Sequence, residues 1–514
     1  MLASNVNMAW PAIILLVTQF LMLAVFTFFA FFNYLYGIAS LWKQRVRRTQ
    51  PSGKRVAVVI VAFNEKYVLE KTIRACECLS YPNKLILLGD DSTDPQVVER
   101  LRSFAVSRGC KKVLRHPFSQ EMNEGYELSR KEPIEIWESP DFVFFHRPSN
   151  AGFKAGNLDK VLRYLASRNI DFMYLLDADW HPQQDALERT LEVIEAHEDV
   201  AFIQTKRLSF PTGMNLFQRY LTLVEEGCYY IDFEGRQVLG HPILFSGCCT
   251  LFRLDAVTRV GGFSPGHLTE DLDLTDRLWL DGWKGIYLGD VINHGEVPFT
   301  YDHYRRQQER WAAGSARALR DFFRPIIRTK KFGWFEKLSA IRQNAYYTTT
   351  LLTGSAILLG MTTVLFLALA WGTYSAEYYL YVMETLKTPF IILLYFCILS
   401  NFVEPLIMIL VKKRRYRELF HLPMMVWYAW SVLIAYIIGN IKGLFGFKLG
   451  WFRTPKLLRS DVGHLPRLPA FMRTLNLCTC LALVCLYFSQ GWFFGWFDEF
   501  ALLWIPAFLL ASIK

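Results

Sequence analysis

The sequence has few charged residues and no cysteine spacing that would hold zinc. Only 20% of its 514 residues are charged, while 52% are hydrophobic and 16% aromatic. This is apolar for a soluble protein, and the clustering of the excess favours a membrane protein. The ten cysteines include no CxxC pair, so we interpret them as reduced, buried thiols of a cytosol-facing chain. No cleavable signal peptide, internal repeat or low-complexity segment stands out.

The positive charge comes largely from clusters that border apolar segments. Lysine and arginine number 57 against 47 aspartates and glutamates, a net charge of +10. A basic balance can serve nucleic acid, but the clusters Arg45–Arg48 and Lys412–Arg415 each follow an uncharged segment. Such placement is typical of the positive-inside pattern, so we expect a lipid bilayer and no nucleic acid as partner.

Long uncharged segments predict transmembrane helices at both ends of the chain. Residues 9–42 carry no charge and exceed the roughly 20 residues that cross a bilayer, so we expect one tilted helix there. Residues 333–344 suit an amphipathic interfacial helix. Residues 419–441 have basic residues on both sides, which predicts an interfacial or re-entrant helix that does not cross. Four further spans are expected at 345–371, 388–411, 474–490 and 500–513.

These segments divide the chain into three parts. We expect an N-terminal transmembrane helix (1–45), a cytoplasmic catalytic domain (46–330) and a C-terminal transmembrane and interfacial domain (331–514). The basic cluster after the first helix places the catalytic domain in the cytoplasm and the N-terminus outside. We therefore expect a multi-pass integral protein of the plasma or inner membrane.

The middle of the chain has an α/β pattern. Continuous β-branched and apolar runs predict buried strands at 55–63, 84–89 and 172–177. Helical patterns between them, at 66–79, 95–108 and 155–168, indicate βαβ units and a mostly parallel sheet. Residues 116–141 interrupt this pattern, and we interpret them as a surface excursion.

Acidic pairs follow two of the predicted strands. Asp90-Asp91 follows the second and Asp177-Ala-Asp179 the third, and ligands of open α/β sheets bind beyond the carboxyl ends of strands. Carboxylates so placed can hold Mg²⁺ or Mn²⁺ on a diphosphate. An Asp at a strand end can also cap a helix or turn, but two such clusters with Lys154 between them favour a site.

Three other groups of residues could carry chemistry. Lys154, within a glycine-containing loop, could approach a phosphate, although a plain loop before a helix explains it equally well. The Glu270-Asp271 pair could supply a general base, or Asp271 could cap the helix that follows. Gln307, Arg310 and Trp311 share one helical face and could bind a diphosphate and stack on a sugar, or belong to an ordinary amphipathic helix.

Together these stretches resemble processive family 2 glycosyltransferases of the cellulose synthase superfamily, especially cellulose synthase-like mannan and glucan synthases. The resemblance covers roughly residues 54–460. The matching motifs stand in the expected order: Asp90–Pro95, Gly152–Gly156, Asp177–Pro182, Tyr287–Asp290 and Gln307–Trp311.

The resemblance implies a GT-A fold and an inverting transfer from a nucleotide sugar. Asn64, Glu65 and Asp90 or Asp91 would contact the nucleoside. Phe245–Cys249 resembles the segment that lines the acceptor site, with cysteines where the family usually has a small residue. The remaining expected roles are diphosphate and ribose binding by Lys154 and Asp177, metal binding by Asp179, general base catalysis by Asp271 beside Glu270, and binding of the diphosphate and the acceptor end by Gln307, Arg310 and Trp311.

Two features lie nearer the C-terminus. Trp451–Lys456, within residues 448–460, resembles the gating loop of cellulose synthases, with Thr454 and Lys456 able to reach a diphosphate; a basic juxtamembrane turn is the alternative. Glu404 lies inside an expected span, where a carboxylate suggests a functional site, such as a polar path for polysaccharide; snorkelling or helix capping explains it equally well. No Arg-x-x-x-Arg cyclic-dinucleotide module follows.

The leading hypothesis is a membrane-embedded processive glycosyltransferase that extends a β-linked hexose polymer and translocates it. The expected donor is UDP-glucose, with GDP-mannose as the alternative, and the growing polysaccharide is the second substrate. A homo-oligomer stays open. One competing hypothesis is a non-processive lipid glycosyltransferase of the ceramide glucosyltransferase type. Another is a catalytically silent scaffold or transporter, which would not need Asp179, Asp271 and Arg310.

Overall fold

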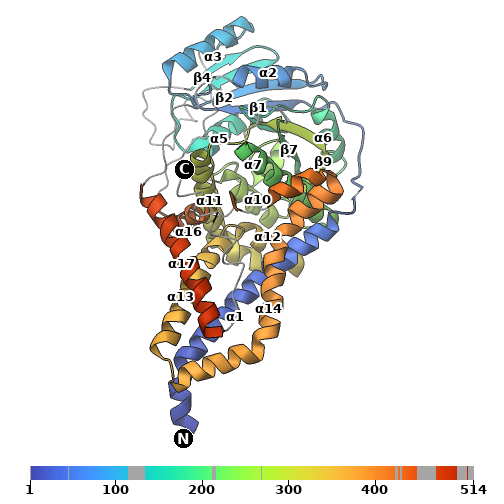
Figure 1. The fold of residues 1–514 in the computed structure, drawn as a ribbon. Helices are drawn as coiled ribbons and strands as arrows, with labels where there is room; N and C mark the ends of the chain where they lie inside the picture. Colours follow the sequence, from blue (N-terminus) through green and yellow to red (C-terminus); the bar gives the residue numbers. More distant parts are fainter. Residues whose placement is uncertain are drawn as a thin grey trace.

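The protein combines an α/β domain with long apolar helices that extend away from it on one side (Figure 1). This computed structural model describes residues 2–43, 45–66, 68–113, 134–210, 216–267, 269–422, 427–428, 431–447, 470–494 and 506. The predicted gating loop, with Thr454 and Lys456, lies outside the described residues, as does most of the predicted span 500–513.

One nine-stranded sheet organises the α/β domain, in the order β3-β4-β5-β2-β1-β6-β8-β7-β9. The strands are β1 (Val56–Ala62), β2 (Lys84–Asp90), β3 (Lys111–Lys112), β4 (Glu135–Glu138), β5 (Phe142–His146), β6 (Phe172–Asp177), β7 (Val200–Ser209), β8 (Thr250–Arg253) and β9 (Lys284–Gly295). The three predicted strands are thus confirmed as β1, β2 and β6, side by side at the centre.

The sheet is mixed, so the expectation of a mostly parallel sheet was wrong. The pairs β5/β2, β2/β1, β1/β6 and β7/β9 are parallel, while β3/β4, β4/β5, β6/β8 and β7/β8 are antiparallel. The central βαβ units show in the sequence as alternating patterns. The outer pairings join distant segments, and residues 135–138 of the expected surface excursion form a strand.

Amphipathic helices cover both faces of the sheet with their apolar sides. Helices α2 (Leu69–Glu77), α3 (Pro95–Ser107) and α6 (Ala186–Ile194) contribute to the core on one face. Helices α5 (Phe153–Ala166), α9 (Leu254–Arg259) and α10 (Glu270–Asp281) do so on the other. Burial of both sheet faces explains why β1 and β2 read as continuous apolar runs rather than alternating patterns.

Five more helical segments connect the sheet to the apolar helices. They are α7 (Leu216–Gly227), the π-helix η1 (Cys228–Phe233), α8 (Glu234–Leu239), α11 (Tyr301–Arg328) and α12 (Trp334–Asn344). Helix α12 coincides with the predicted interfacial helix at 333–344. Its Trp334 and Phe335 are among the exposed large hydrophobic side chains.

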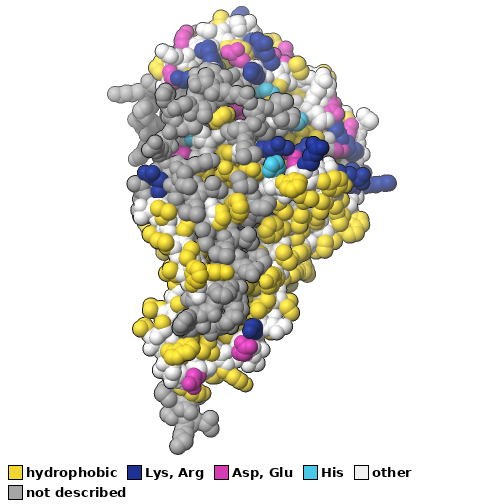
Figure 2. All heavy atoms as spheres, viewed as in Figure 1, with side chains coloured by type: hydrophobic (Ala, Val, Ile, Leu, Met, Phe, Trp, Pro, Cys, Tyr) yellow, Lys and Arg dark blue, Asp and Glu magenta, His cyan; other side chains and the backbone are white. Residues whose placement is uncertain are grey.

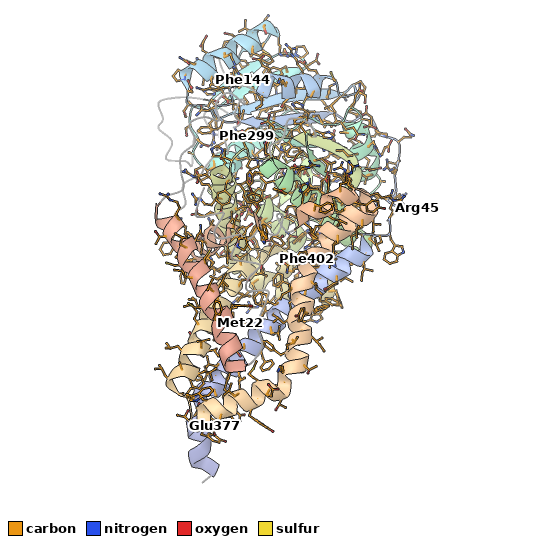
Figure 3. All side chains as sticks on the ribbon, in the orientation of Figure 1. Met22, Arg45, Phe144, Phe299, Glu377 and Phe402 are labelled. Atoms are coloured by element: carbon orange, nitrogen blue, oxygen red, sulfur yellow. The ribbon has the colours of Figure 1, made fainter. Side chains whose placement is uncertain are left out.

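Three helices in the described part of the chain are long and apolar enough to cross a membrane. They comprise Ala9–Ala39 of α1 (Leu2–Ala39), all of α13 (Thr348–Leu369), and α14 (Tyr374–Ile407) with the π-helix η2 (Met408–Lys412). Hydrophobic side chains dominate the surface of this part (Figure 2). Met22 and Phe402 lie within it and Arg45 near its border with the α/β domain (Figure 3).

Helix α14 begins earlier than the predicted span at 388. Its first turns carry Glu377, Glu384 and Lys387, which hid them from an interpretation based on uncharged runs. The helix changes direction along its length (Figure 1). Pro389 lies inside it and removes an intrahelical hydrogen bond, the usual origin of such a bend.

The segment predicted not to cross contains two short helices. Residues Tyr416–His421 form the 3-10 helix η3, and Leu433–Phe445 form α16, which has 13 residues. A helix of 13 residues is about 20 Å long, short of the roughly 30 Å hydrocarbon core. Residues 423–426 and 429–430 lie outside the described residues, so the prediction that 419–441 does not cross stays a prediction. Helix α17 (Ala470–Phe494) covers the predicted span 474–490.

A buried ion network joins α1, η1, α8 and α12. The carboxylate of Asp232 accepts from Arg236 Nε at 2.6 Å and from Arg342 Nη1 at 2.8 Å. Arg342 Nη2 also donates to Asn33 Oδ1 at 2.7 Å. Glu404 of α14 interacts electrostatically with Asp232 and both arginines. This electrostatic interaction adds a structural explanation for Glu404 to the two that the sequence left open.

Candidate active site

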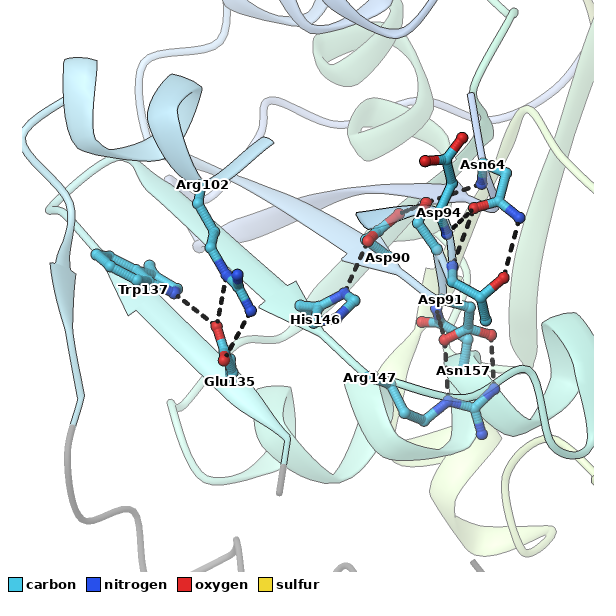
Figure 4. A network of polar contacts seen from close by, with 12 residues as sticks. Asn64, Asp90, Asp91, Asp94, Arg102, Glu135, Trp137, His146, Arg147 and Asn157 are labelled. Atoms are coloured by element: carbon cyan, nitrogen blue, oxygen red, sulfur yellow. Dashed lines mark hydrogen bonds and ion pairs between the residues drawn. The ribbon is translucent and has the colours of Figure 1, made fainter. Parts of the chain in front are cut away.

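The loops after β1 and β2 form a densely bonded cluster at the carboxyl end of the sheet (Figure 4). Parallel pairing places Ala62 opposite Asp90, so the two loops meet. Asn64 has a left-handed backbone, with φ 53°. Its side-chain oxygen accepts from the amides of Thr93 and Asp94, each at 2.9 Å. Asn64 therefore shapes this loop, and its predicted contact with a nucleoside stays a prediction.

Asp90 and Asp91 are both buried, at 0% and 3% exposure. Asp90 accepts from Ser92 Oγ at 2.6 Å and pairs with His146 Nδ1 at 2.8 Å. Asp91 accepts from Arg147 Nε and Nη2 at 2.9 and 2.6 Å. Burial raises the pKa of Asp91 to about 6, although Arg147 opposes the rise. Both carboxylates therefore have hydrogen-bond partners within the protein.

Three neighbours complete this cluster. Asn157 Nδ2 donates to Asp91 Oδ1 at 2.7 Å, and Arg147 Nη1 donates to Ala151 O at 2.6 Å. Glu65, the other predicted nucleoside contact, is 7% exposed and its backbone carbonyl accepts from Arg100. Arg147 and Asn157 were missed as partners of the acids. Only the parallel pairing of β2 with β5, which ends at Asp90 and His146, brings Arg147 there.

Lys154 joins three parts of the predicted site. It lies in the first turn of α5, and its Nζ donates to Asp177 Oδ1 at 2.6 Å and to Gly247 O at 2.7 Å. The same Nζ lies 3.3 Å from Glu270 Oε1. Burial alone would lower the pKa of Lys154, but Asp177 and Glu270 outweigh it and raise that pKa. The prediction that Lys154 and these acids share one site is consistent with these contacts.

Asp271, the predicted general base, lies at the start of α10. Helix α10 begins at Glu270 with Thr269 at the N-cap position, so Asp271 lies in the first turn and is not the cap. Burial and the neighbouring Glu270 raise the pKa of Asp271 to about 7, opposed by the Leu272 amide, Lys154 and Arg310. A carboxylate that titrates near neutral pH is suited to accept a proton from a hydroxyl.

Asp179 is the candidate metal ligand. Its side chain is 4% exposed, and its Oδ2 accepts from the Glu296 amide at 3.3 Å. Within the described ranges, no three His, Cys, Asp or Glu side chains converge as a ready-made metal site. Mg²⁺ commonly binds through one or two carboxylates plus substrate phosphates. The oxygen donors of Asp179 fit such an ion if it arrives with a diphosphate.

The pentad Gln307–Trp311 lies in α11 beside this site. Gln307, Arg310 and Trp311 are half-buried, and the charge of Arg310 acts on Asp271. One turn further along α11, a Cβ added to Gly314 would lie 2.0 Å from Thr269 Cγ2. Glycine at this position therefore lets the Thr269-Glu270-Asp271 segment pack directly on the helix that carries Arg310.

The other side of the pentad is held by α16. Tyr436 Oη donates to Gln308 Oε1 at 3.0 Å, and Lys442 Nζ pairs with Glu309 Oε1 at 2.6 Å. A Cβ on Gly439 would lie 2.3 Å from Glu309 O, so the two helices touch at their backbones. The pentad thus divides as the helical spacing predicts, with residues 308 and 309 held by α16.

Sequence comparison gives this arrangement a context. Residues 172–511 match the family model described as glycosyl transferase family group 2. The chain is 30% identical to glucomannan 4-beta-mannosyltransferase 2 of Arabidopsis thaliana over 292 residues, 56% of this chain and 49% of that protein. It is 28% identical to probable glucomannan 4-beta-mannosyltransferase 4 of Oryza sativa subsp. japonica over 285 residues, 55% and 47% of the two chains. It therefore spans about half the length of these curated relatives.

The chain is also similar to solved structures, among them a mannosyltransferase. The mannosyltransferase PcManGT from Pyrobaculum calidifontis, in complex with GDP-Man and Mn²⁺, has 17% sequence identity and a TM-score of 0.48. The similarity covers 85% of this chain and 99% of that chain.

Proposed function

The chain belongs to glycosyl transferase family group 2, within the cellulose synthase superfamily, and we propose that it is a membrane-embedded, processive, inverting hexosyltransferase. In this proposal it extends a β-linked hexose polysaccharide from a nucleotide sugar and passes the product across the bilayer. The observation that carries the proposal is the convergence of Lys154 on Asp177 at 2.6 Å and on Glu270 at 3.3 Å, next to Asp271. Burial and Glu270 raise the pKa of Asp271 to about 7.

The proposed transfer is a single displacement. The hydroxyl at the acceptor end gives its proton to an oxygen of Asp271 as it attacks the anomeric carbon of the donor. The bond between that carbon and the diphosphate oxygen breaks, and the leaving diphosphate takes the electron pair. Attack from the opposite side inverts the anomeric centre. Arg310 supplies positive charge beside this reaction, which favours the developing negative charge on the leaving group.

Lys154 and Asp177 have a preparatory part in the proposed site. Lys154 holds Asp177 and the Gly247 carbonyl together, so it sets the distance between the strand end of β6 and the Phe245–Cys249 segment. We assign Asp177 to the ribose and diphosphate side of the donor. Asp179 would hold a divalent ion, Mg²⁺ or Mn²⁺, which neutralises the diphosphate when bound.

A mannosyl donor is now favoured over the glucosyl donor that the sequence suggested. Both compared relatives are named as glucomannan 4-beta-mannosyltransferases, so we propose GDP-mannose as the donor and a β-1,4-linked mannan or glucomannan as the product. UDP-glucose is the donor to test against it. This choice concerns which nucleobase and which sugar the site recognises, and leaves the proposed role of Asp271 unchanged.

The membrane helices support a polymer product. Helix α11, which carries the pentad, is followed directly by α12 and the apolar helix α13. We propose that the α/β domain faces the cytoplasm, where nucleotide sugars are made, and that the acceptor end leaves the site toward these helices. Thr454 and Lys456 are proposed to close over the donor from the same side.

A donor panel tests the proposal. The full chain, purified in lipid nanodiscs with Mg²⁺ or Mn²⁺, is incubated with GDP-mannose or UDP-glucose. Polymer is then sized and digested with β-1,4-mannanase or β-1,4-glucanase. We expect long mannanase-sensitive polymer from GDP-mannose. Polymer from UDP-glucose alone would overturn the donor assignment, and a single hexose on a lipid would replace processive synthesis with lipid glycosylation.

A further inference from the structure

Strand β7 carries a run of polar residues into the protein interior. Gln204, Thr205 and Lys206 are 0%, 0% and 3% exposed, and Arg207 follows them. Buried polar groups in proteins have hydrogen-bond partners, so the partners reveal what such residues organise. Gln204 Oε1 accepts from Ser246 N at 2.8 Å, and its Nε2 donates to Cys248 O at 3.1 Å. The run therefore holds the segment Phe245–Cys249.

Arg207 makes the most elaborate contacts in this run. Its Nη1 donates to Ser246 O at 3.0 Å and lies 3.2 Å from Cys248 Sγ. Its Nε donates to the hydroxyl of Tyr229, which is also bonded to Ser246 Oγ at 2.9 Å. The guanidinium lies 5.2 Å from the centre of the Trp180 ring. The side chain of Arg207 thus contacts Trp180, Tyr229 of the π-helix η1, and the segment Phe245–Cys249, called the acceptor segment below because it resembles the one that lines the acceptor site.

Two cations hold successive carbonyls of the acceptor segment. Arg207 binds Ser246 O, and Lys154 binds Gly247 O at 2.7 Å. Gly247 has φ 90°, a conformation that glycine adopts without strain. A Cβ placed there would lie 3.5 Å from Asp271 Oδ2. The backbone that Arg207 fixes therefore runs directly past the proposed base.

Trp180 gives Arg207 a rigid reference point. Trp180 is 6% exposed, and a Cβ on Gly295 would lie 2.4 Å from its ring, so the ring fills the space beside the end of β9. Asp179, the candidate metal ligand, precedes it in the chain. Through the ring, the position of Arg207 is fixed relative to the donor side of the site.

We propose that Arg207 is a positioning residue of the transferase site, which sets the acceptor segment 245–249 relative to the loop of Asp179. It thereby fixes the acceptor hydroxyl between Asp271 and the donor sugar. This inference rests on the proposed function and adds a determinant of acceptor alignment to it. Lysine cannot replace the arginine, because it lacks the planar fork that reaches Ser246 O and Tyr229 together.

Misalignment has a chemical signature. In productive transfer the acceptor oxygen bonds to the anomeric carbon, its proton goes to Asp271, and the nucleoside diphosphate leaves. When the acceptor hydroxyl is displaced, water can take its place, and the donor is converted to free hexose and nucleoside diphosphate. The ratio of free hexose to polymer therefore reports alignment and does not depend on how much enzyme is folded.

The test compares Arg207→Lys with Arg253→Lys in the full chain, in nanodiscs. Arg253 is a matched control, because it also holds backbone carbonyls, those of Val200, Ile194 and His197, but outside the site. We expect Arg207→Lys to lower kcat for polymer by about 100-fold, as a 1 Å misplacement can. Its donor KM should stay unchanged and its ratio of free hexose to polymer should rise severalfold. Arg253→Lys should keep the wild-type ratio.

Tyr229→Phe provides a second variant, which removes a single oxygen atom and leaves Arg207 in place. It removes the hydroxyl between Arg207 and Ser246, and we expect a smaller rise in the same ratio. If Arg207→Lys and Tyr229→Phe both keep the wild-type ratio of free hexose to polymer while the wild type is active, the role of Arg207 is overturned and the proposed function stands. Equal losses of polymer in the two lysine variants at the wild-type ratio would do the same. A wild-type protein that transfers no sugar would overturn the proposed function, and this inference with it.

Discussion

The two halves of the candidate site differ in how their charges are satisfied. On the side predicted to contact the nucleoside, Asp90 and Asp91 accept from Ser92, His146 and Arg147 inside the protein. On the transfer side, the carboxyl of Asp271 accepts from its neighbouring amide at 2.9 Å, and its pKa is raised to about 7. In the first half, the two carboxylates have hydrogen-bond and ion-pair partners within the protein. In the second half, the pKa of Asp271 lies near neutral pH.

The difference indicates that the first half fixes the backbone of the site and that the second half carries the group that can accept a proton. A densely hydrogen-bonded buried cluster fixes its backbone in one arrangement, which suits the predicted recognition of a nucleoside. Burial raises the pKa of Asp91 as well, to about 6, but Arg147 donates two hydrogen bonds to that carboxylate. At Asp271 the neighbouring Glu270 adds to the rise caused by burial, and carboxyls raised in this way concentrate where protons are transferred. Substitutions in the first half should therefore reduce stability and donor binding together, while substitutions in the second should reduce turnover with the fold intact.

Asp271→Asn is the largest test of this comparison. The amide cannot accept the acceptor proton, and general base catalysis contributes up to about 10⁴-fold. We expect polymer synthesis to fall by at least about 10³-fold, measured by radiolabelled sugar incorporation. Donor binding, measured by calorimetry, should stay within about twofold, because removing a buried charge does not open the side predicted to contact the nucleoside.

Asp281→Asn is the control for that substitution. It lies at the other end of α10 and is partly exposed. It pairs with Arg259 at 3.0 Å and Lys331 at 3.8 Å and accepts from Trp283 Nε1, and an exposed ion pair contributes at most about 1 kcal/mol. Its activity should match the wild type. Normal sugar incorporation by Asp271→Asn would remove Asp271 as the base.

Asp91→Asn should affect the first half through stability. Arg147 is 2% exposed, and removing one partner of a buried ion pair costs about 3–5 kcal/mol. We expect a fall of this size in the free energy of unfolding, measured in urea, and weaker donor binding. Asp94→Asn in the same loop should cost less than about 1 kcal/mol, since asparagine caps a helix as well as aspartate. A larger loss for Asp94→Asn than for Asp91→Asn would contradict the comparison.

The sequence predicted the acids better than their partners. Asp90, Asp91, Asp177 and Asp179 follow apolar runs that had to be strands, so local pattern alone placed them at one edge of the sheet. Arg207 could not be found in this way, because its partners Tyr229 and Ser246 come together only through the pairing of β7, β8 and β9. The one local sign was the polar stretch Gln204–Arg207 inside an otherwise apolar strand.

The membrane part shows the same limit. Uncharged runs predicted α1 and α13, where length and composition decide. Helix α14 begins 14 residues before the predicted start, at Tyr374 instead of 388, because charges near the end of a long helix break the run without ending the helix. Local pattern also does not indicate contacts between distant elements, such as the ion pair of Lys412 with Glu234 at 2.8 Å.

Gly314→Ala tests whether the segment Thr269–Asp271 depends on close packing against α11. A methyl group there would overlap Thr269, and overpacking of this kind costs about 1–3 kcal/mol. We expect a loss of about 2 kcal/mol in unfolding free energy and lower kcat, because Asp271 moves relative to Arg310. Gly227→Ala is the matched helical control, since the added Cβ would meet Glu404 Cβ at 3.8 Å, an ordinary contact. Equal stability of the two variants would refute the close packing.

The pH dependence of kcat is the smallest and most specific effect. Asp271 must be deprotonated to act as a base, and its pKa is raised to about 7 by burial and by Glu270. Activity should therefore be full above about pH 8 and fall roughly tenfold per unit below 7. In Glu270→Gln the repelling charge is gone, so the pKa of Asp271 should drop and the acid limb should move to lower pH. If kcat of Glu270→Gln falls at the same acidic pH as that of the wild type, another group titrates. The raised pKa of Asp271 would then no longer distinguish its half of the site.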